Sequence, residues 1–213
     1  MTWKIKFKED PLIQIIQIAL ELWVRSQCKS LSEIKVDIHG STSDILSGNI
    51  SRTKVEASNV NFKNISLEKV ELISGPVNIK INFFNKENRI NIEESFWING
   101  FISLGEEDLN GIIKSEDWNW ISDALAENLL GTEHRLKKIN INHNSLGFHA
   151  SNIHSEELRV EEYDIKASSG TLKFSSQKSP KFFLLPMDPS IKIEKVEIQN
   201  NKILISLNSE VNP

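Results

Sequence analysis

Residues 12–27 read LIQIIQIALELWVRSQ, an almost wholly apolar segment broken by polar residues at helical spacing. Gln14, Gln17, Glu21 and Arg25 lie three and four positions apart, so on a helix they form one narrow polar stripe. Ile, Leu, Ala, Trp and Val occupy the rest of the helix surface. The spacing predicts a helix over 12–27 that must be covered by apolar surface from elsewhere in the chain.

Segments in which apolar and polar residues alternate could cover this helix. Two segments, residues 77–83 (VNIKINF) and Ile139-Asn-Ile-Asn, place apolar residues on one face and polar residues on the other. Such strands predict a sheet with one apolar face that cradles the helix. Any surplus of that face can hold another apolar molecule, and a lipid is the natural candidate.

Further alternation and turn residues place the other elements. Strands are expected at Ile34–Ile38, in several short pieces between Ile50 and Leu72, at Phe96–Leu104, Leu158–Ile165 and Leu172–Phe174, with hairpins at 77–92 and 191–207. Asn200-Asn201 marks the turn of the last hairpin. Thr2–Lys8 fits either a short strand or an apolar lead-in to the helix.

A helical interlude interrupts the strands. Glu106, Glu107 and Asp108 supply the negative charge that favours a helix start, and a break is expected near Lys114. Ser115 is then the expected N-cap of a second helix that Gly131 ends.

These elements predict an α+β protein. A strongly curved, mainly antiparallel β-sheet wraps the N-terminal amphipathic helix, and a short helical segment lies in mid-chain around Glu106–Leu130. The 213 residues suffice for one domain with its own core, so we expect a single lipid-binding-like domain over 1–213. The 191–207 hairpin is either part of this domain or an extension of it.

Charge and hydropathy limit the partners. With 25 Lys and Arg against 29 Asp and Glu, the net charge is −4, so no nucleic-acid partner is expected. A helix over 12–27 would rise ~24 Å, short of a hydrocarbon core of about 30 Å. Charged and polar residues interrupt it, and no cleavage site follows. We expect a protein that is cytoplasmic or peripheral on a membrane, without a signal peptide or transmembrane helix; its oligomeric state stays open.

Catalytic signatures are missing from the sequence. It has no Gly-x-Ser-x-Gly elbow, no phosphate-binding glycine-rich loop and no dinucleotide fingerprint. Its five histidines form no metal-ligand spacing. We therefore expect no enzyme, no metal site and no cofactor.

Three apolar features are candidates for lipid contact, and each could equally be core. The helix face is the first, a Trp pair two positions apart the second, and an apolar segment between Pro180 and Pro186 the third. The candidate residues are Ile15, Ile16, Ala19, Leu22, Trp23, Trp118, Trp120, Phe182 and Phe183.

Several segments resemble a known family. They are Ile18–Cys28, Leu46-Ser-Gly-Asn-Ile, the strands of Val55–Ile79, and Leu104-Gly-Glu-Glu-Asp-Leu-Asn110 before Trp118. Over roughly residues 10 to 180 they are similar to cyanobacterial-type members of the LmeA-like phospholipid-binding family, formerly a domain of unknown function. The resemblance implies phospholipid binding in a membrane setting, without an established enzymatic step.

Two functions follow from this reading. The first is a non-enzymatic protein that binds a phospholipid or other acyl-chain ligand and shuttles it at a membrane surface by peripheral contact. The alternative is a protein-interaction or structural domain with a filled core and no ligand. An apolar cavity favours the first, and a filled core with an exposed strand edge favours the second.

Overall fold

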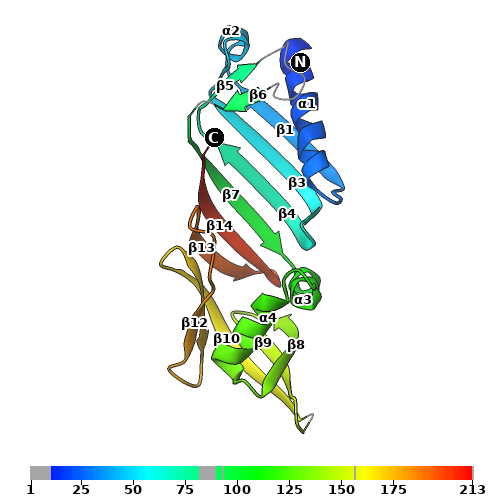
Figure 1. Ribbon diagram of the computed structural model, residues 1–213, viewed down its shortest axis with the longest axis vertical. Helices are drawn as coiled ribbons and strands as arrows, with labels where there is room; N and C mark the ends of the chain where they lie inside the picture. The colour runs from blue at the N-terminus through cyan, green and yellow to red at the C-terminus, as the bar shows by residue number, and fades with distance from the viewer. Residues whose placement is uncertain (1–10, 82–89, 93, 156, 213) are drawn as a thin grey trace, which may run out of the picture.

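The computed structural model describes residues 11–81, 90–92, 94–155 and 157–212 (Figure 1). Thr2–Lys8, expected as either a short strand or an apolar lead-in to the helix, lies outside these residues, as does the turn of the 77–92 hairpin. In chain order the elements are α1 (Pro11–Gln27), β1 (Glu33–His39), α2 (Thr42–Leu46), β2 (Asn49–Ile50), β3 (Arg52–Phe62), β4 (Ile65–Ser74), β5 (Val77–Ile81), β6 (Ile90–Ile92), β7 (Phe96–Leu104), α3 (Glu106–Lys114), α4 (Asn119–Leu125), the π-helix η1 (Ala126–Leu130), β8 (His134–Ile141), β9 (Leu146–Asn152), β10 (Leu158–Ser168), β11 (Thr171–Ser176), β12 (Phe182–Leu184), β13 (Ile191–Gln199) and β14 (Lys202–Val211).

Six antiparallel strands form the larger sheet, in the order β1-β3-β4-β7-β14-β13. Between Ile50 and Leu72 the expectation of several short strands was wrong, because β3 and β4 are long partners joined at Lys63-Asn64. Both turn residues have positive φ, 48° and 62°, which matches the twist of a two-residue hairpin turn. This tight turn joins β3 directly to β4, so apolar and polar residues alternate along two long paired strands.

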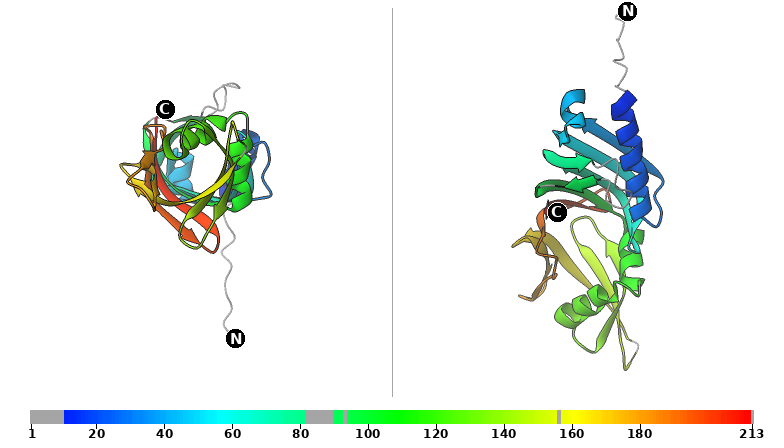
Figure 2. Two further views of the ribbon diagram at one scale, coloured as in Figure 1. Left: turned by 90° about the horizontal axis from the view of Figure 1, so that it is seen from below. Right: turned by 45° about the horizontal axis from the view of Figure 1, so that its top comes forward.

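The two faces of this sheet differ in chemistry because the strands pair in register. One face carries apolar rows that cross all six strands: Val36, Val55, Leu72, Gly100, Leu207 and Ile193 form one, and Ile34, Ala57, Val70, Ile102, Ile205 and Val196 the next. On the opposite face the intervening row is Lys35, Glu56, Glu71, Phe101, Ser206 and Lys195. Figure 2 shows that the sheet is strongly curved. We call the apolar side, on which α1 lies, the concave face.

Helix α1 covers one edge of the concave face. Ile13, Ile16 and Leu20 pack against a small core cluster of Val36, Ile38, Ile45 and Ile50. The predicted helix and the α+β class with mainly antiparallel sheets are confirmed. The helix is covered on one side only, however, because it packs beside β1 rather than along the middle of the sheet.

The second sheet has the order β12-β11-β10-β9-β8 and packs with α3, α4 and η1. Its inner residues share one large core cluster with the ends of β7, β13 and β14, so the two sheets enclose a common interior. Phe148, Ala150 and Tyr163 are completely buried there. The predicted break near Lys114 is confirmed, but Ser115 caps the end of α3 and the next helix begins only at Asn119.

The hairpin of β13 and β14 belongs to the larger sheet. Its Asn200-Asn201 turn has φ values of 53° and 57°, and the predicted hairpin is confirmed. Strand β14 pairs with β7 over the whole of Phe96–Leu104, while β13 lies against β10 of the second sheet. The hairpin thus joins the two sheets.

Tyr163 links the second sheet to η1 through its buried hydroxyl group. The hydroxyl donates to Glu161 Oε2 at 2.6 Å and lies 3.1 Å from the carbonyl oxygen of Leu129. Arg159 forms an ion pair with Glu161. Burial and the Glu161 carboxylate raise the pKa of Tyr163, so the hydroxyl keeps its proton as donor.

Replacing Tyr163 by Phe is expected to lower the free energy of unfolding by about 1–2 kcal/mol, because the Glu161 carboxylate loses a buried hydrogen-bond donor. Urea unfolding followed by circular dichroism measures this. The control is Lys195→Ala, which removes an exposed ion pair with Glu197 and should change stability by less than about 0.5 kcal/mol. Wild-type stability in Tyr163→Phe would contradict the assignment.

Candidate functional site

The middle of the concave face is an apolar surface that the two core clusters leave uncovered. Val70, Leu72 and Ile98 lie on β4 and β7 between the clusters, and among the described residues neither cluster includes them. All three side chains are half-buried, so each keeps contact with solvent. The surface is therefore apolar like the protein core, but other side chains cover it only in part.

Gly100 lies at the centre of this surface. A Cβ atom there would come 2.7 Å from Leu207 Cδ1 and 3.4 Å from Leu72 Cδ2, so these two leucines lean over the glycine. A glycine inside a central strand permits a tight bend and close approach of its neighbours. The missing side chain at Gly100 thus lets Leu72 and Leu207 approach each other across β7.

The uncovered part of the concave face is smaller than the sheet. Six strands spaced about 4.8 Å apart span about 24 Å, but α1 covers the β1 end of this span and the large cluster covers the β13–β14 end, so the uncovered residues lie on β4 and β7. The neighbouring row along the strands is mixed: it contains the hydroxyl residues Thr53, Ser74 and Ser209 together with Ile38, Ile98 and Ile191. Ser74 Oγ already accepts a hydrogen bond from the Thr53 amide at 3.1 Å. The surface thus has hydroxyl groups beside its apolar rows.

Helix α1 leaves a second apolar surface in contact with solvent. Ile15, Ile18, Leu22 and Trp23 are 63, 57, 62 and 59% exposed, and Ala19 is exposed beside them. Of the helix candidates, only Ile16 packs in the core. We call the five exposed residues the α1 stripe.

The other candidate residues are dispersed. Trp118 donates its indole N–H to the carbonyl oxygen of Lys63 at 2.7 Å, while Trp120 keeps an exposed ring. Phe182 is exposed on β12 with Lys173 Nζ 4.6 Å from its ring centroid, whereas Phe183 packs into the large cluster. The structure therefore separates α4, which carries Trp120, and β12, which carries Phe182 and Phe183, from α1 (Figure 1), whereas Trp118 lies at the turn between β3 and β4.

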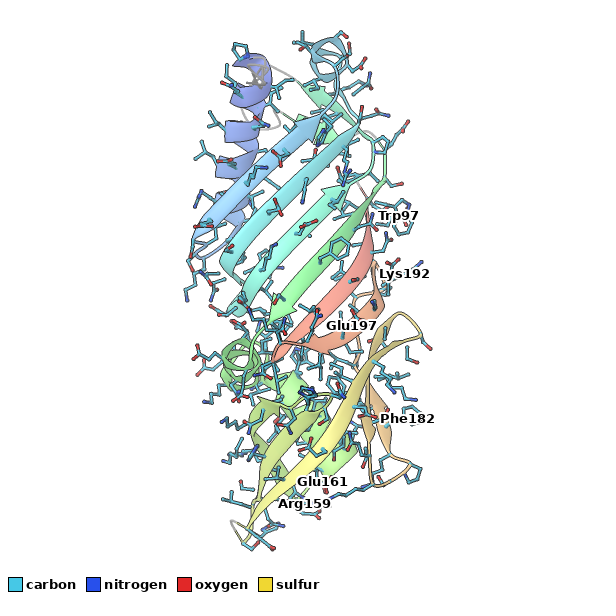
Figure 3. The ribbon with its side chains drawn as sticks, turned by 180° about the vertical axis from the view of Figure 1, so that it is seen from behind. Trp97, Arg159, Glu161, Phe182, Lys192 and Glu197 are labelled. Atoms are coloured by element: carbon cyan, nitrogen blue, oxygen red, sulfur yellow. The ribbon has the colours of Figure 1, made fainter. Side chains whose placement is uncertain are left out.

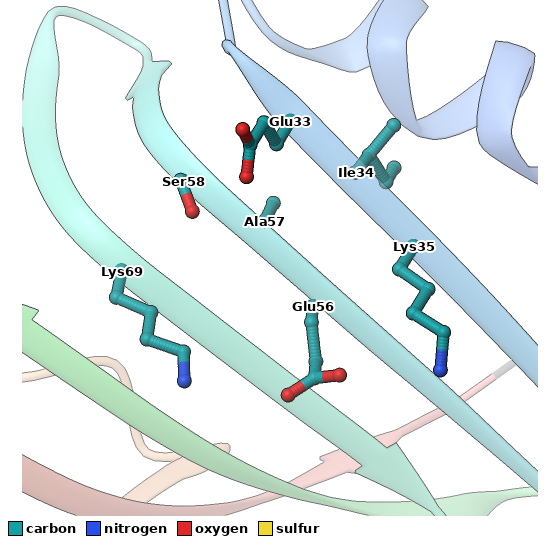
Figure 4. A pocket seen from close by; sticks show the side chains of 7 residues that line it. All are labelled: Glu33, Ile34, Lys35, Glu56, Ala57, Ser58 and Lys69. Atoms are coloured by element: carbon teal, nitrogen blue, oxygen red, sulfur yellow. The ribbon is translucent and has the colours of Figure 1, made fainter.

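The convex face of the larger sheet is charged. Figure 3 views this side, with Trp97, Lys192 and Glu197 labelled. Lys192 Nζ lies 5.6 Å from the centroid of the exposed Trp97 ring. A hollow of about 460 Å³ in this face is lined by Glu33, Lys35, Glu56, Ser58 and Lys69 with Ile34 and Ala57 (Figure 4). Its charged lining makes it unsuited to an acyl chain.

A second hollow of about 460 Å³ lies where β3 and β4 meet the start of α3. Asn59, Asn61, Glu68 and the segment 105–108 contribute polar groups to its lining. Neither hollow is the apolar cavity expected of a lipid-binding protein. Among the described residues, the middle of the concave face is an apolar surface that stays partly exposed.

Asp108 lies in the first turn of α3, at the rim of this second hollow. Its Oδ2 accepts the Gly105 amide at 2.8 Å, which caps the helix. Burial raises the pKa of the Asp108 carboxyl, and the neighbouring Glu68 and Glu107 carboxylates raise it further, against the lowering effect of the Gly105 hydrogen bond.

One known protein family matches most of the chain. Residues 8–208 match the family described as LmeA-like phospholipid-binding. The chain belongs to this family. Its family match covers the β13–β14 hairpin almost completely, and membership supports a lipid-binding role. No curated protein and no solved structure matches the chain significantly.

This member of the LmeA-like family has, within the part of the chain that the structure describes, no helix long and apolar enough to cross a bilayer. Sequence reasoning found the α1 residues but missed Val70, Leu72 and Ile98. Alternation within β4 and β7 was the available signal, but only the strand order shows that these residues adjoin.

Asp108→Asn is expected to reduce the fall in unfolding free energy as pH rises above about 4. A folded-state pKa above the ordinary value of about 3.9 means that this group's stability contribution is present at low pH and lost as pH rises through the folded pKa. Asparagine keeps the acceptor for Gly105 without the charge. Urea unfolding at pH 4 to 7 measures the difference.

Asp108→Ala serves as the control, because it removes both charge and acceptor and should lose about 1 kcal/mol at neutral pH. A wild-type pH dependence in Asp108→Asn would refute the assigned effect of the charge.

Proposed function

We propose that the protein binds phospholipid by laying an acyl chain on the concave face of the larger sheet. The observation that carries this proposal is the half-buried apolar surface of Val70, Leu72 and Ile98 between two filled clusters. Membership of a phospholipid-binding family supports it.

Hydrocarbon burial supplies the binding free energy. Each methylene removed from water contributes about 0.8 kcal/mol, so a tail of a dozen or more methylenes gains on the order of 10 kcal/mol if fully covered. On this surface the tail touches protein on one side, and the gain is correspondingly smaller. The hydroxyl groups of Thr53, Ser74 and Ser209 give the polar part of the lipid a compatible neighbour.

The proposed activity is shuttling without chemical conversion of the lipid. A tail held by hydrocarbon burial leaves slowly into water but transfers readily into another apolar phase. The protein would therefore load and unload in contact with a membrane, as a peripheral protein. Among the described residues, α1 covers only the β1 side of the concave face and leaves its middle accessible, which is compatible with such exchange.

Leu72→Gln is expected to lower the amount of co-purifying phospholipid at least about fivefold, because a polar amide replaces hydrocarbon in the middle of the surface. Native mass spectrometry and organic extraction of the purified protein measure bound lipid. The matched control is Ile73→Gln: Ile73 is the next residue of β4, is also half-buried, and lies on the opposite face.

Circular dichroism and urea unfolding would establish that both variants are folded. Equal lipid content in Leu72→Gln and Ile73→Gln would refute the concave face as the binding surface. Wild-type protein that carries no lipid, and takes none from liposomes, would refute lipid binding altogether.

A further inference from the structure

We infer that the α1 stripe is a docking surface for the lipid bilayer, through which the protein meets the membrane that supplies or receives its lipid. This inference rests on the proposed function for its purpose but concerns a different surface. Its residues are Ile15, Ile18, Ala19, Leu22 and Trp23, and the side chains of all five are exposed.

The arrangement of α1 separates two apolar sides. Ile13, Ile16 and Leu20 pack against the small core cluster, so this side of the helix is already covered. Ile15, Ile18 and Leu22 recur at positions i, i+3 and i+7 on another side, so they form one continuous stripe. Folding alone leaves this stripe unexplained.

From Ile15 to Trp23 the stripe joins the core-facing side without a polar interruption. By helical periodicity, Ala19 and Trp23 lie between the stripe's centre and Ile16, whereas Gln14, Glu21 and Arg25 lie along its other border. Apolar surface therefore continues around α1 toward the residues that contact the concave face. A lipid that leaves a bilayer in contact with α1 would follow apolar surface toward the proposed site.

The chemistry of the stripe favours a bilayer over a second protein chain. A helix of 17 residues is about 25 Å long and about 10 Å wide, so it offers a face on the order of 250 Å². A stable protein interface buries about 800 Å² on each partner. Bulky aliphatic residues with one Trp, beside a polar border, are typical of helices that lie in a membrane interface.

Hydrocarbon burial rather than charge attraction would drive docking. The stripe contains no charged residue, and the whole chain has a net charge of −4. Binding should therefore occur on phosphatidylcholine vesicles without anionic lipid and should persist at high salt.

The test compares two double variants for sedimentation with phosphatidylcholine vesicles. Ile18→Gln with Leu22→Gln should lower the vesicle partition coefficient at least about tenfold, because each large apolar side chain contributes about tenfold or more when it leaves water. The matched control is Leu158→Gln with Val160→Gln, which removes two residues of 78 and 52% exposure from β10, in the other sheet. This control should sediment like wild type.

Lipid loading is measured separately, with a monomeric short-chain phosphatidylcholine supplied from solution. The α1 double variant should load like wild type, whereas Leu72→Gln should dock on vesicles but load poorly. Wild-type sedimentation of the α1 double variant, an equal loss in the β10 control, or no sedimentation of wild type would overturn the inference. A change of oligomeric state in the α1 variant alone, without loss of vesicle binding, would also overturn it, since it would identify a second copy as the occupant.

Discussion

The structure depends on one constraint, the in-register pairing of six strands whose side chains alternate. Because side chains alternate with a period of two, interrupted on β13 by a register shift between Ile193 and Lys195, each apolar row of the larger sheet continues across all its neighbours, and so does the mainly polar row between them. A shift of one residue in any strand would turn its apolar side chains toward the charged convex face. The apolar area that results is wider than a single helix can cover, and α1 covers the β1 edge alone.

The remainder of the fold limits where this area stays accessible. At one end the second sheet, α4 and η1 complete a large core with β7, β13 and β14. At that end α3 also protects the edge of β8: Asn110 exchanges two hydrogen bonds with the Ile139 backbone, and Glu106 accepts the Ile141 amide. An open strand edge is thus paired with side chains rather than left for another chain. Within the part of the chain that the structure describes, the apolar surface left uncovered is the middle of the concave face.

Sequence reasoning could predict what is encoded locally. Strand β7 and the β13–β14 hairpin follow from alternation and an Asn-Asn turn, and the break after Lys114 follows from helix spacing. Strand β9 was missed because its outward positions are Gly147 and His149, which give a weak alternation signal although Phe148 and Ala150 are completely buried. The concave face could not be assembled from sequence, since β14 pairs with a strand about a hundred residues earlier. The α1 residues were accessible to sequence reasoning, but which of them face solvent depends on where the helix meets β1.

Uncovered apolar surface is a liability in water, and the distribution of charge offsets it. Ion pairs of Lys54 with Glu56 and Glu71, and of Lys195 with Glu197, contribute charge to the convex face, although the exposed rings of Trp97 and Phe101 also lie there. A chain selected only for stability would fill the concave face, for example by placing a longer helix along it. A protein that carries lipid there, as we propose, cannot do this, because every side chain that fills the surface competes with the ligand for the same contacts. Under that proposal, the half-buried state of Val70, Leu72 and Ile98 is a compromise between solubility of the empty protein and affinity for a tail.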